Sequence, residues 1–120
     1  MKTLIVVLAL CVLTCAKSCP KSSEITQEDI NSVNTVALVT VTDSEYGNHY
    51  YLHYVKYFDV TQTAPPTKWE DYRIFSIGCD NVTLEENFDY ILGCTVENSD
   101  CKFVRRYDKL TEEEKKLLKI

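Results

Sequence analysis

Several residue types are scarce in this chain, and each scarcity excludes a class of protein. Glycine and proline occur three times each among 120 residues, which excludes collagen-like chains and disordered chains rich in those residues. Beyond the first twenty positions, no apolar run approaches the ~20 residues that are needed to cross a bilayer. The composition is therefore typical of one small globular domain.

Basic residues are also in deficit. Thirteen lysines and arginines stand against 18 acidic residues, and the formal net charge is −5 at pH 7. Nucleic acids and anionic membranes attract basic proteins, so this charge argues against both as partners. We expect a neutral or basic protein partner instead.

The common motifs of enzyme active sites are missing as well. There is no nucleophile elbow around a serine and no spacing typical of metal ligands. His49 and His53 are four residues apart on a predicted strand, which separates them by ~13 Å and prevents them from sharing one metal ion. We therefore expect no enzymatic activity, no metal site of the protein's own and no cofactor.

Residues 1–18 have the composition of a secretory signal peptide. Lys2 precedes an unbroken apolar run over 4–13, and the sequence becomes polar from Lys21 onward. The small residues Ala16 and Ser18 allow cleavage just before Cys19, whereas Thr14 and Ala16 allow it before Lys17. We expect a secreted, extracellular domain over 19–120. The sequence alone does not choose between the two cleavage sites.

Four of the six cysteines lie after this leader: Cys19, Cys79, Cys94 and Cys101. An even number of cysteines in a small secreted domain predicts a disulfide framework. Two bridges are expected, and the sequence alone allows three pairings. Asn81-Val82-Thr83 is an N-glycosylation acceptor in a predicted turn, so we expect a glycoprotein modified at Asn81.

The hydrophobic pattern predicts five strands between two helices. A short helix is expected within 22–33 with a cap at Thr26 and Asp29, and a C-terminal helix begins with a capping box between Thr111 and Glu114. Glu112, Glu113 and Glu114 are expected to face solvent at that helix start. The strands are expected at 36–42, 49–60, 72–79, 88–95 and 102–107.

The predicted strand over 49–60 carries apolar side chains on both faces, as a strand does when it bends across a barrel. Five short strands with a helix at each end in about a hundred residues predict a mainly β fold. The expected architecture is a five-stranded antiparallel barrel of the OB type, stapled by disulfides.

Five features of the chain also occur together in a known module. They are a cysteine near the mature N-terminus (Cys19), a strand led by a helix (33–39), a strand closed by a cysteine (75–79), a strand closed by glycine (88–93), and a final cysteine, strand and helix (101–114). In this order and spacing they resemble the netrin-like module and, within it, the N-terminal domain of the tissue inhibitors of metalloproteinases. The resemblance covers the whole mature length.

One departure from that family concerns the N-terminus. The inhibitors begin with Cys-x-Cys, whereas Pro20 and Lys21 follow Cys19 here, so the second bridge that holds the inhibitors' N-terminus is missing. The resemblance implies a Cys19–Cys79 bridge and leaves Cys101 to pair with Cys94 across the turn between the last two strands.

The resemblance also implies a function. In the inhibitors, the α-amine and carbonyl of the first cysteine chelate the zinc of an extracellular metalloprotease, the role expected here of Cys19, with Pro20 directed at the protease's specificity pocket. Ser76, Ile77 and Gly78 would form a second contact strip. The alternative is a netrin-like module that binds another extracellular protein without inhibiting it. In either case we expect a monomer.

Overall fold

The computed structural model describes residues 19–45, 49–62, 72–76, 79, 82–96 and 100–120. The predicted leader and its cleavage sites, the glycosylation acceptor Asn81 and the contact residues Ile77 and Gly78 lie outside the described residues. Within these residues, no helix is long and apolar enough to span a membrane.

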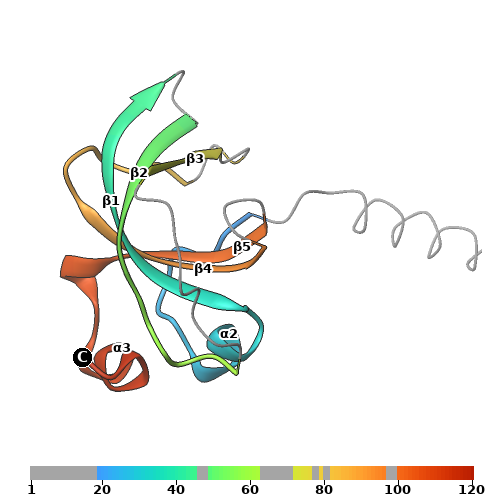
Figure 1. Cartoon of the computed structure of the whole chain (residues 1–120). Coiled ribbons are helices and arrows are strands. Elements are labelled where there is room, and N and C mark those ends of the chain that lie inside the picture. Colours follow the sequence, from blue (N-terminus) through green and yellow to red (C-terminus); the bar gives the residue numbers. More distant parts are fainter. Residues whose placement is uncertain (1–18, 46–48, 63–71, 77–78, 80–81, 97–99) are drawn as a thin grey trace, which may run out of the picture.

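Five antiparallel strands form a single curled sheet, which confirms the predicted mainly β class (Figure 1). The strands run in the order β3-β2-β1-β4-β5, so β3 and β5 are the edges of a half-barrel. Register shifts between Leu38 and Val39 and between Val41 and Asp43 mark irregularities in the β1–β2 ladder, and such bulges bend a strand. The five strands are β1 (Thr35–Glu45), β2 (His49–Tyr57), β3 (Tyr72–Ser76), β4 (Asp89–Val96) and β5 (Asp100–Arg106).

All five strands differ from the expected bounds, β4 and β5 by only one or two residues. β3 ends at Ser76 instead of Cys79, and β1 and β2 differ mainly at their C-terminal ends. β1 continues to Glu45 because its last residues still pair with β2, where Glu45 lies opposite His49. β2 ends at Tyr57 instead of continuing to residue 60, and the next side chain, Phe58, is buried in a different apolar cluster from the rest of the strand.

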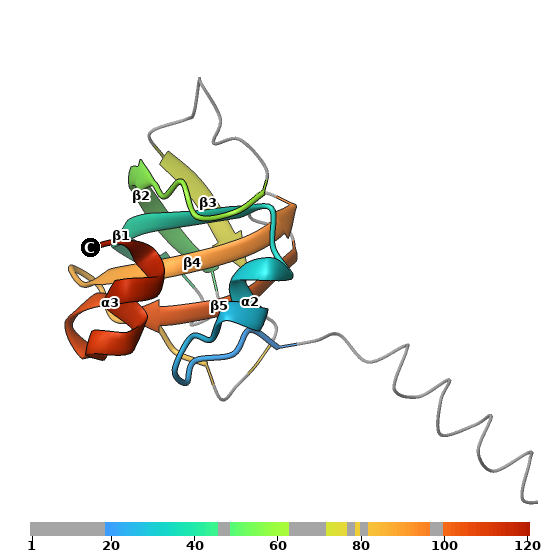
Figure 2. The same ribbon diagram turned by 90° about the horizontal axis from the view of Figure 1, so that it is seen from below.

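Strands β1, β4 and β5 carry buried side chains on both of their faces. Side chains inside the curl form one cluster, which includes Val39, Tyr50, Leu52, Leu92 and Val104. Side chains from the outer face form a second cluster with the helices α2 (Gln27–Asn31) and α3 (Glu112–Leu118). Both helices lie on the same side of the sheet (Figures 1 and 2). A strand can therefore be apolar at consecutive positions, as at residues 90–92.

Both helices begin where the capping pattern places them. The Thr26 side chain accepts a hydrogen bond from the Asp29 amide, and the Asp29 carboxylate accepts one from the Thr26 amide. Thr111 and Glu114 make the same reciprocal pair at α3. Helix α2 is shorter than the expected 22–33 because the chain is still extended at its N-cap Thr26.

The expectation that Glu114 faces solvent is wrong. Its side chain is fully buried, whereas Glu112 and Glu113 on the same turn are exposed. The carboxylate lies between α3, β5 and the N-terminal segment, where it accepts hydrogen bonds from all three. Burial of a charge is tolerated only when it is paired and hydrogen-bonded, and Glu114 meets that condition.

Gly93 on β4 permits a close aromatic contact. Its cross-strand partner on β5 is Phe103, and a β-carbon at position 93 would overlap the Phe103 ring. Phe103 is completely buried in the cluster beneath the helices. The absence of a side chain at position 93 therefore allows the ring to lie flat on the sheet.

Candidate functional site

The N-terminal segment is fixed to the rest of the domain at Cys19 and at Lys21. Cys19 is exposed and forms a disulfide with Cys79, and Pro20 next to it is half-buried. Lys21 then bridges to the free edge of β5: its amide donates to the Lys102 carbonyl at 2.8 Å, and its carbonyl accepts from the Val104 amide at 2.8 Å. The backbone on both sides of Pro20 is therefore held.

The Lys21 side chain adds a further tether. Its ammonium lies 2.8 Å from the Asp29 carboxylate, which also caps helix α2. Burial alone would raise the pKa of Asp29, but hydrogen bonds from Lys21 and Thr26 outweigh it and hold that pKa below its usual value. A backbone bridge and an ion pair at Lys21 therefore hold the segment that follows Cys19.

Farther along, the segment is locked to the C-terminal helix. The Ile25 amide donates to Glu114 at 2.9 Å, and the Arg105 guanidinium donates to both oxygens of the same carboxylate. Burial by itself would raise the pKa of Glu114, yet the hydrogen bonds from Ile25, Thr111 and Arg105 lower it below its usual value. Glu114 is therefore an ionised link between the two ends of the domain.

The remaining predicted site residues are only partly described. Ser76 is exposed at the end of β3, and its hydroxyl lies 2.7 Å from Nδ1 of His49. The second disulfide joins Cys94 and Cys101, which are cross-strand partners on β4 and β5. Both disulfide pairings are those that the resemblance implied.

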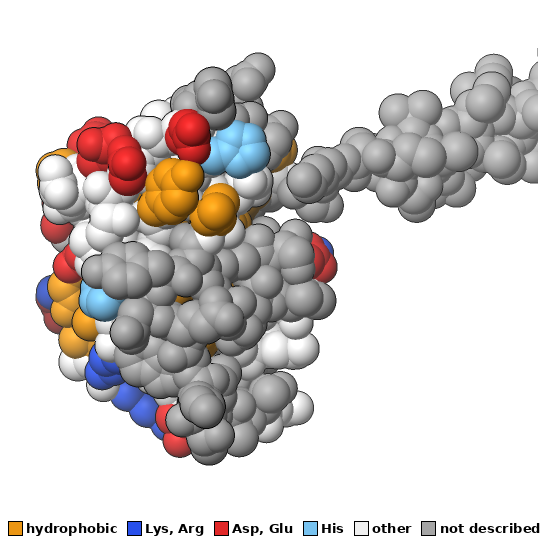
Figure 3. Space-filling model, turned by 45° about the horizontal axis from the view of Figure 1, so that its top comes forward, with side chains coloured by type: hydrophobic (Ala, Val, Ile, Leu, Met, Phe, Trp, Pro, Cys, Tyr) orange, Lys and Arg blue, Asp and Glu red, His pale blue; other side chains and the backbone are white. Residues whose placement is uncertain are grey.

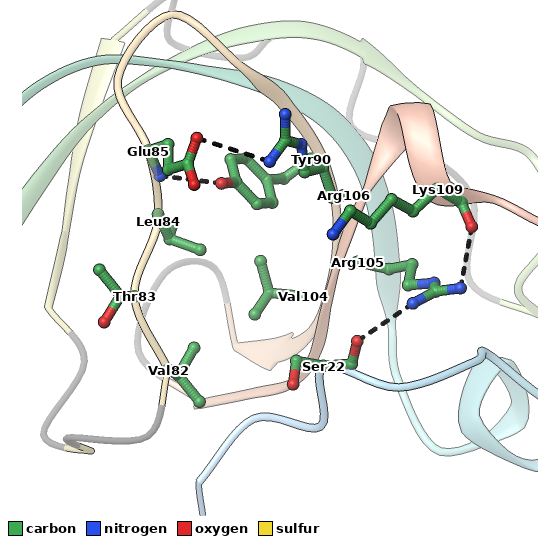
Figure 4. Close-up of a pocket in the computed structure, with 10 residues that line it drawn as sticks. All are labelled: Ser22, Val82, Thr83, Leu84, Glu85, Tyr90, Val104, Arg105, Arg106 and Lys109. Atoms are coloured by element: carbon green, nitrogen blue, oxygen red, sulfur yellow. Dashed lines mark hydrogen bonds and ion pairs between the residues drawn. The ribbon is translucent and has the colours of Figure 1, made fainter.

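A pocket of about 280 Å³ lies beside the N-terminal segment, between β5 and the chain that leads into β4 (Figure 4). Its apolar lining comes from Val82, Leu84, Val104 and the ring of Tyr90. The Tyr90 hydroxyl accepts a hydrogen bond from the Glu85 amide at 2.8 Å, and burial raises the pKa of this phenol despite that bond and the nearby Arg106. The pocket wall is thus fixed by hydrogen bonding as well as by packing.

The rim of this pocket is basic, in contrast to the acidic chain as a whole. Arg105, Arg106 and Lys109 contribute to it, and Glu85 supplies a carboxylate. Arg105 is fully engaged by Glu114 and by the carbonyls of Ser22 and Lys109.

The other two cations are less completely paired. Nε of Arg106 lies 2.8 Å from an Asp108 oxygen, but the two are poorly aligned, so this buried N–H makes no hydrogen bond. The Lys109 ammonium has no hydrogen-bond or ion-pair partner in the described part of the chain.

Sequence reasoning did not identify this pocket. Its lining comes from three stretches, 82–85, 90 and 104–109, together with Ser22, and no motif connects them. The one local signal was the run Arg105-Arg106 in a chain short of basic residues. Among the described residues, no three histidine, cysteine, aspartate or glutamate side chains are grouped so as to hold a metal ion.

The comparisons with known proteins point to one family. Residues 17–119 match the family model described as excretory-secretory protein 2. The crystal structure of excretory-secretory protein 2 from Ancylostoma ceylanicum is similar, with 44% sequence identity and a TM-score of 0.76 over 85% of this chain and 94% of that one. A comparison with curated proteins found no match. The chain therefore belongs to the excretory-secretory protein 2 family.

Proposed function

We propose that this protein is secreted and inhibits an extracellular zinc metalloprotease through the backbone of Cys19. The observation that carries the proposal is the fixation of an exposed Cys19 between its disulfide to Cys79 and the Lys21 bridge to β5. Membership of an excretory-secretory family supports secretion. The protein itself needs no catalytic residue for this function and acts as a ligand rather than an enzyme.

The proposed chemistry requires a free α-amine on Cys19, and hence cleavage of the leader directly before it. An α-amine has a pKa of about 8, so a useful fraction is unprotonated near neutral pH. Together with the Cys19 carbonyl it would form a five-membered ring with the protease zinc and displace the bound water. Nitrogen and oxygen donors are both common zinc ligands.

The two tethers would favour this chelate by reducing the entropy lost on binding. Cys19 is joined to Cys79, three residues beyond the end of β3, where the exposed Ser76 would supply a second contact. Pro20 restricts the backbone that follows the chelating residue. Since Pro20 is half-buried, it would fill a specificity pocket less deeply than a free side chain.

The experiment compares two forms of the secreted protein with intact disulfides: one beginning at Cys19, verified by peptide mass, and one with a single alanine added before Cys19. Both are assayed against a panel of extracellular metalloproteases. We expect inhibition by the first form and none by the second, because the added residue converts the amine into an amide. Equal inhibition by both forms, or none by either at micromolar concentration, would refute chelation.

A second candidate is a netrin-like module that binds another extracellular protein through its sheet. It is favoured by the exposed apolar residues Val55 and Ile74, which are 42% and 58% exposed on the outer side of β2 and β3. Asp43 and Glu45 lie near the C-terminal end of the neighbouring strand β1. Figure 3 shows hydrophobic side chains beside acidic and histidine side chains on this part of the surface. Such a surface suits a partner that presents apolar and basic groups.

The binding-module candidate predicts that the alanine-extended form stays active and that a substitution on the β2–β3 surface abolishes activity. Binding to immobilised extracellular matrix proteins should persist in the alanine-extended form and be lost in Ile74→Asp. Ile74 is exposed, so this substitution should leave the fold intact. Binding that Ile74→Asp leaves unchanged would refute the role of the β2–β3 surface.

A further inference from the structure

The pocket beside β5 has an apolar wall and a basic rim, on which the charge of Lys109 is unpaired within the described part of the chain. Val82, Leu84 and Val104 line it, while the Lys109 side chain extends toward it from the 3-10 helix η1 (Tyr107–Lys109) (Figure 4). Most basic side chains of the described chain have an acidic partner, whereas the Lys109 ammonium has none there. The unpaired Lys109 ammonium and the pocket beside it together indicate that a ligand binds here.

Arg106 provides the second part of the charge. Its guanidinium stacks on the Phe88 ring at 3.8 Å from the ring centre, which holds the side chain in place. Its Nε lies 2.8 Å from an Asp108 oxygen without making a hydrogen bond, and its pair with Glu85 is long at 3.5 Å. The side chains of Glu85 and Asp108 are 60% and 54% exposed, and exposed ion pairs are weak, so the guanidinium also attracts an anion at the pocket rim.

From this arrangement we propose that the pocket binds a monocarboxylate carried on a short apolar chain. The carboxylate would lie between Lys109 and Arg106, and the chain would lie against Val82, Leu84 and Val104. Glu85 on the rim and the net negative charge of the protein disfavour anions of higher charge. A volume of about 280 Å³ is slightly below the range for drug-sized ligands and suits a chain of about eight carbons.

The site is separate from the proposed inhibitory one. Neither Cys19 nor Pro20 lines it, and only Ser22 of the N-terminal segment contributes. Its occupation therefore requires no free α-amine. The form with an alanine before Cys19 should bind the carboxylate as well as the form that begins at Cys19, so failure of one proposal is distinguishable from failure of the other.

The test is an NMR titration of the secreted, disulfide-bonded protein with octanoate, 1-octanol and octylammonium. We expect octanoate to shift the amide signals of Leu84, Val104 and Lys109, octanol to bind at least about tenfold more weakly, and octylammonium not to bind. Lys109→Gln should weaken octanoate about tenfold, whereas Lys116→Gln, an equal charge change at an exposed site on α3, should have no effect. Ser22→Phe should fill the mouth and prevent binding.

Unchanged amide signals outside the pocket establish that each variant is folded. Equal affinity for octanoate and octanol, or equal affinity of Lys109→Gln and Lys116→Gln, would overturn recognition of the carboxylate. The absence of octanoate-induced shifts at the pocket residues would overturn the site itself.

Discussion

Replacing Glu114 with glutamine should destabilise the protein far more than the same change one residue earlier. The Glu114 carboxylate accepts hydrogen bonds from the Ile25 amide at 2.9 Å, the Thr111 amide at 2.9 Å and two nitrogens of Arg105 at about 3.1 Å. Glutamine keeps one acceptor oxygen and turns the other into a donor. Whichever way the amide is oriented, one backbone N–H and part of the guanidinium lose their acceptor.

The expected cost follows from those losses. Breaking a buried ion pair costs roughly 3–5 kcal/mol, and a buried N–H without an acceptor costs about 1–3 kcal/mol. Arg105 keeps its bond to the Lys109 carbonyl at 2.9 Å, so its charge is not left wholly uncompensated. We therefore expect Glu114→Gln to lower the free energy of unfolding by about 3 kcal/mol, at the lower end of that range.

Glu113→Gln is the matched control. Glu113 is exposed and lies 3.8 Å from Lys116, and exposed ion pairs of this kind contribute about 0–1 kcal/mol. Both variants are measured by urea unfolding with the disulfides intact, at pH 7. A loss below about 1 kcal/mol for Glu114→Gln, close to that of Glu113→Gln, would contradict the assignment of Glu114 as a link between the two ends of the domain.

The destabilisation caused by Glu114→Gln should depend on pH. The pKa of Glu114 is lower in the folded protein than its unfolded value of about 4.5, so its contribution is complete above the unfolded pKa and is lost as the pH falls through the folded pKa. The gap in stability between wild type and Glu114→Gln should stay constant from pH 7 to about 5 and then narrow. A gap that widens with acidification would show that the pKa is raised instead.

Two further predictions concern the sheet and its disulfides. Gly93→Ala should lower the free energy of unfolding by about 1–3 kcal/mol, because the methyl group displaces the buried Phe103 ring; an unchanged urea midpoint would contradict that contact. Removing the Cys19–Cys79 disulfide by paired alanine substitutions should cost about 4 kcal/mol and removing Cys94–Cys101 about 2.5 kcal/mol, since the bridges span 60 and 7 residues. The reverse order in urea unfolding would show that loop length does not set their contributions.

Local features of the fold followed from the sequence because their physical causes are local. Runs of β-branched, aromatic and other apolar residues between turns predicted the strands, and threonine three residues before an acid predicted both helix starts at Thr26 and Thr111. These patterns work because side-chain periodicity and capping involve neighbours in the chain. The mainly β class with a five-stranded antiparallel sheet followed from the number and length of the strands.

Sequence patterns did not predict the features that join distant parts of the chain. Glu114 looks like its exposed neighbours Glu112 and Glu113, and only the packing of α3 against β5 places it beside the Ile25 amide, 89 residues away. Lys21 likewise gave no sign that it would bridge to Lys102 and Val104. Such contacts depend on which surfaces meet after the sheet curls, and that information is spread over the whole chain.

The sequence by itself thus determined the mainly β class, the caps and the cysteines available for two bridges, because each depends on residues near one another in the chain. Only the tertiary structure decided that the chain is held on both sides of Pro20, that Glu114 is buried and that a pocket with a basic rim lies beside β5. These three features arise where the N-terminal segment, β5 and α3 come together. They are stabilised by desolvated contacts between segments that are distant in the chain, and a local sequence pattern cannot predict such contacts.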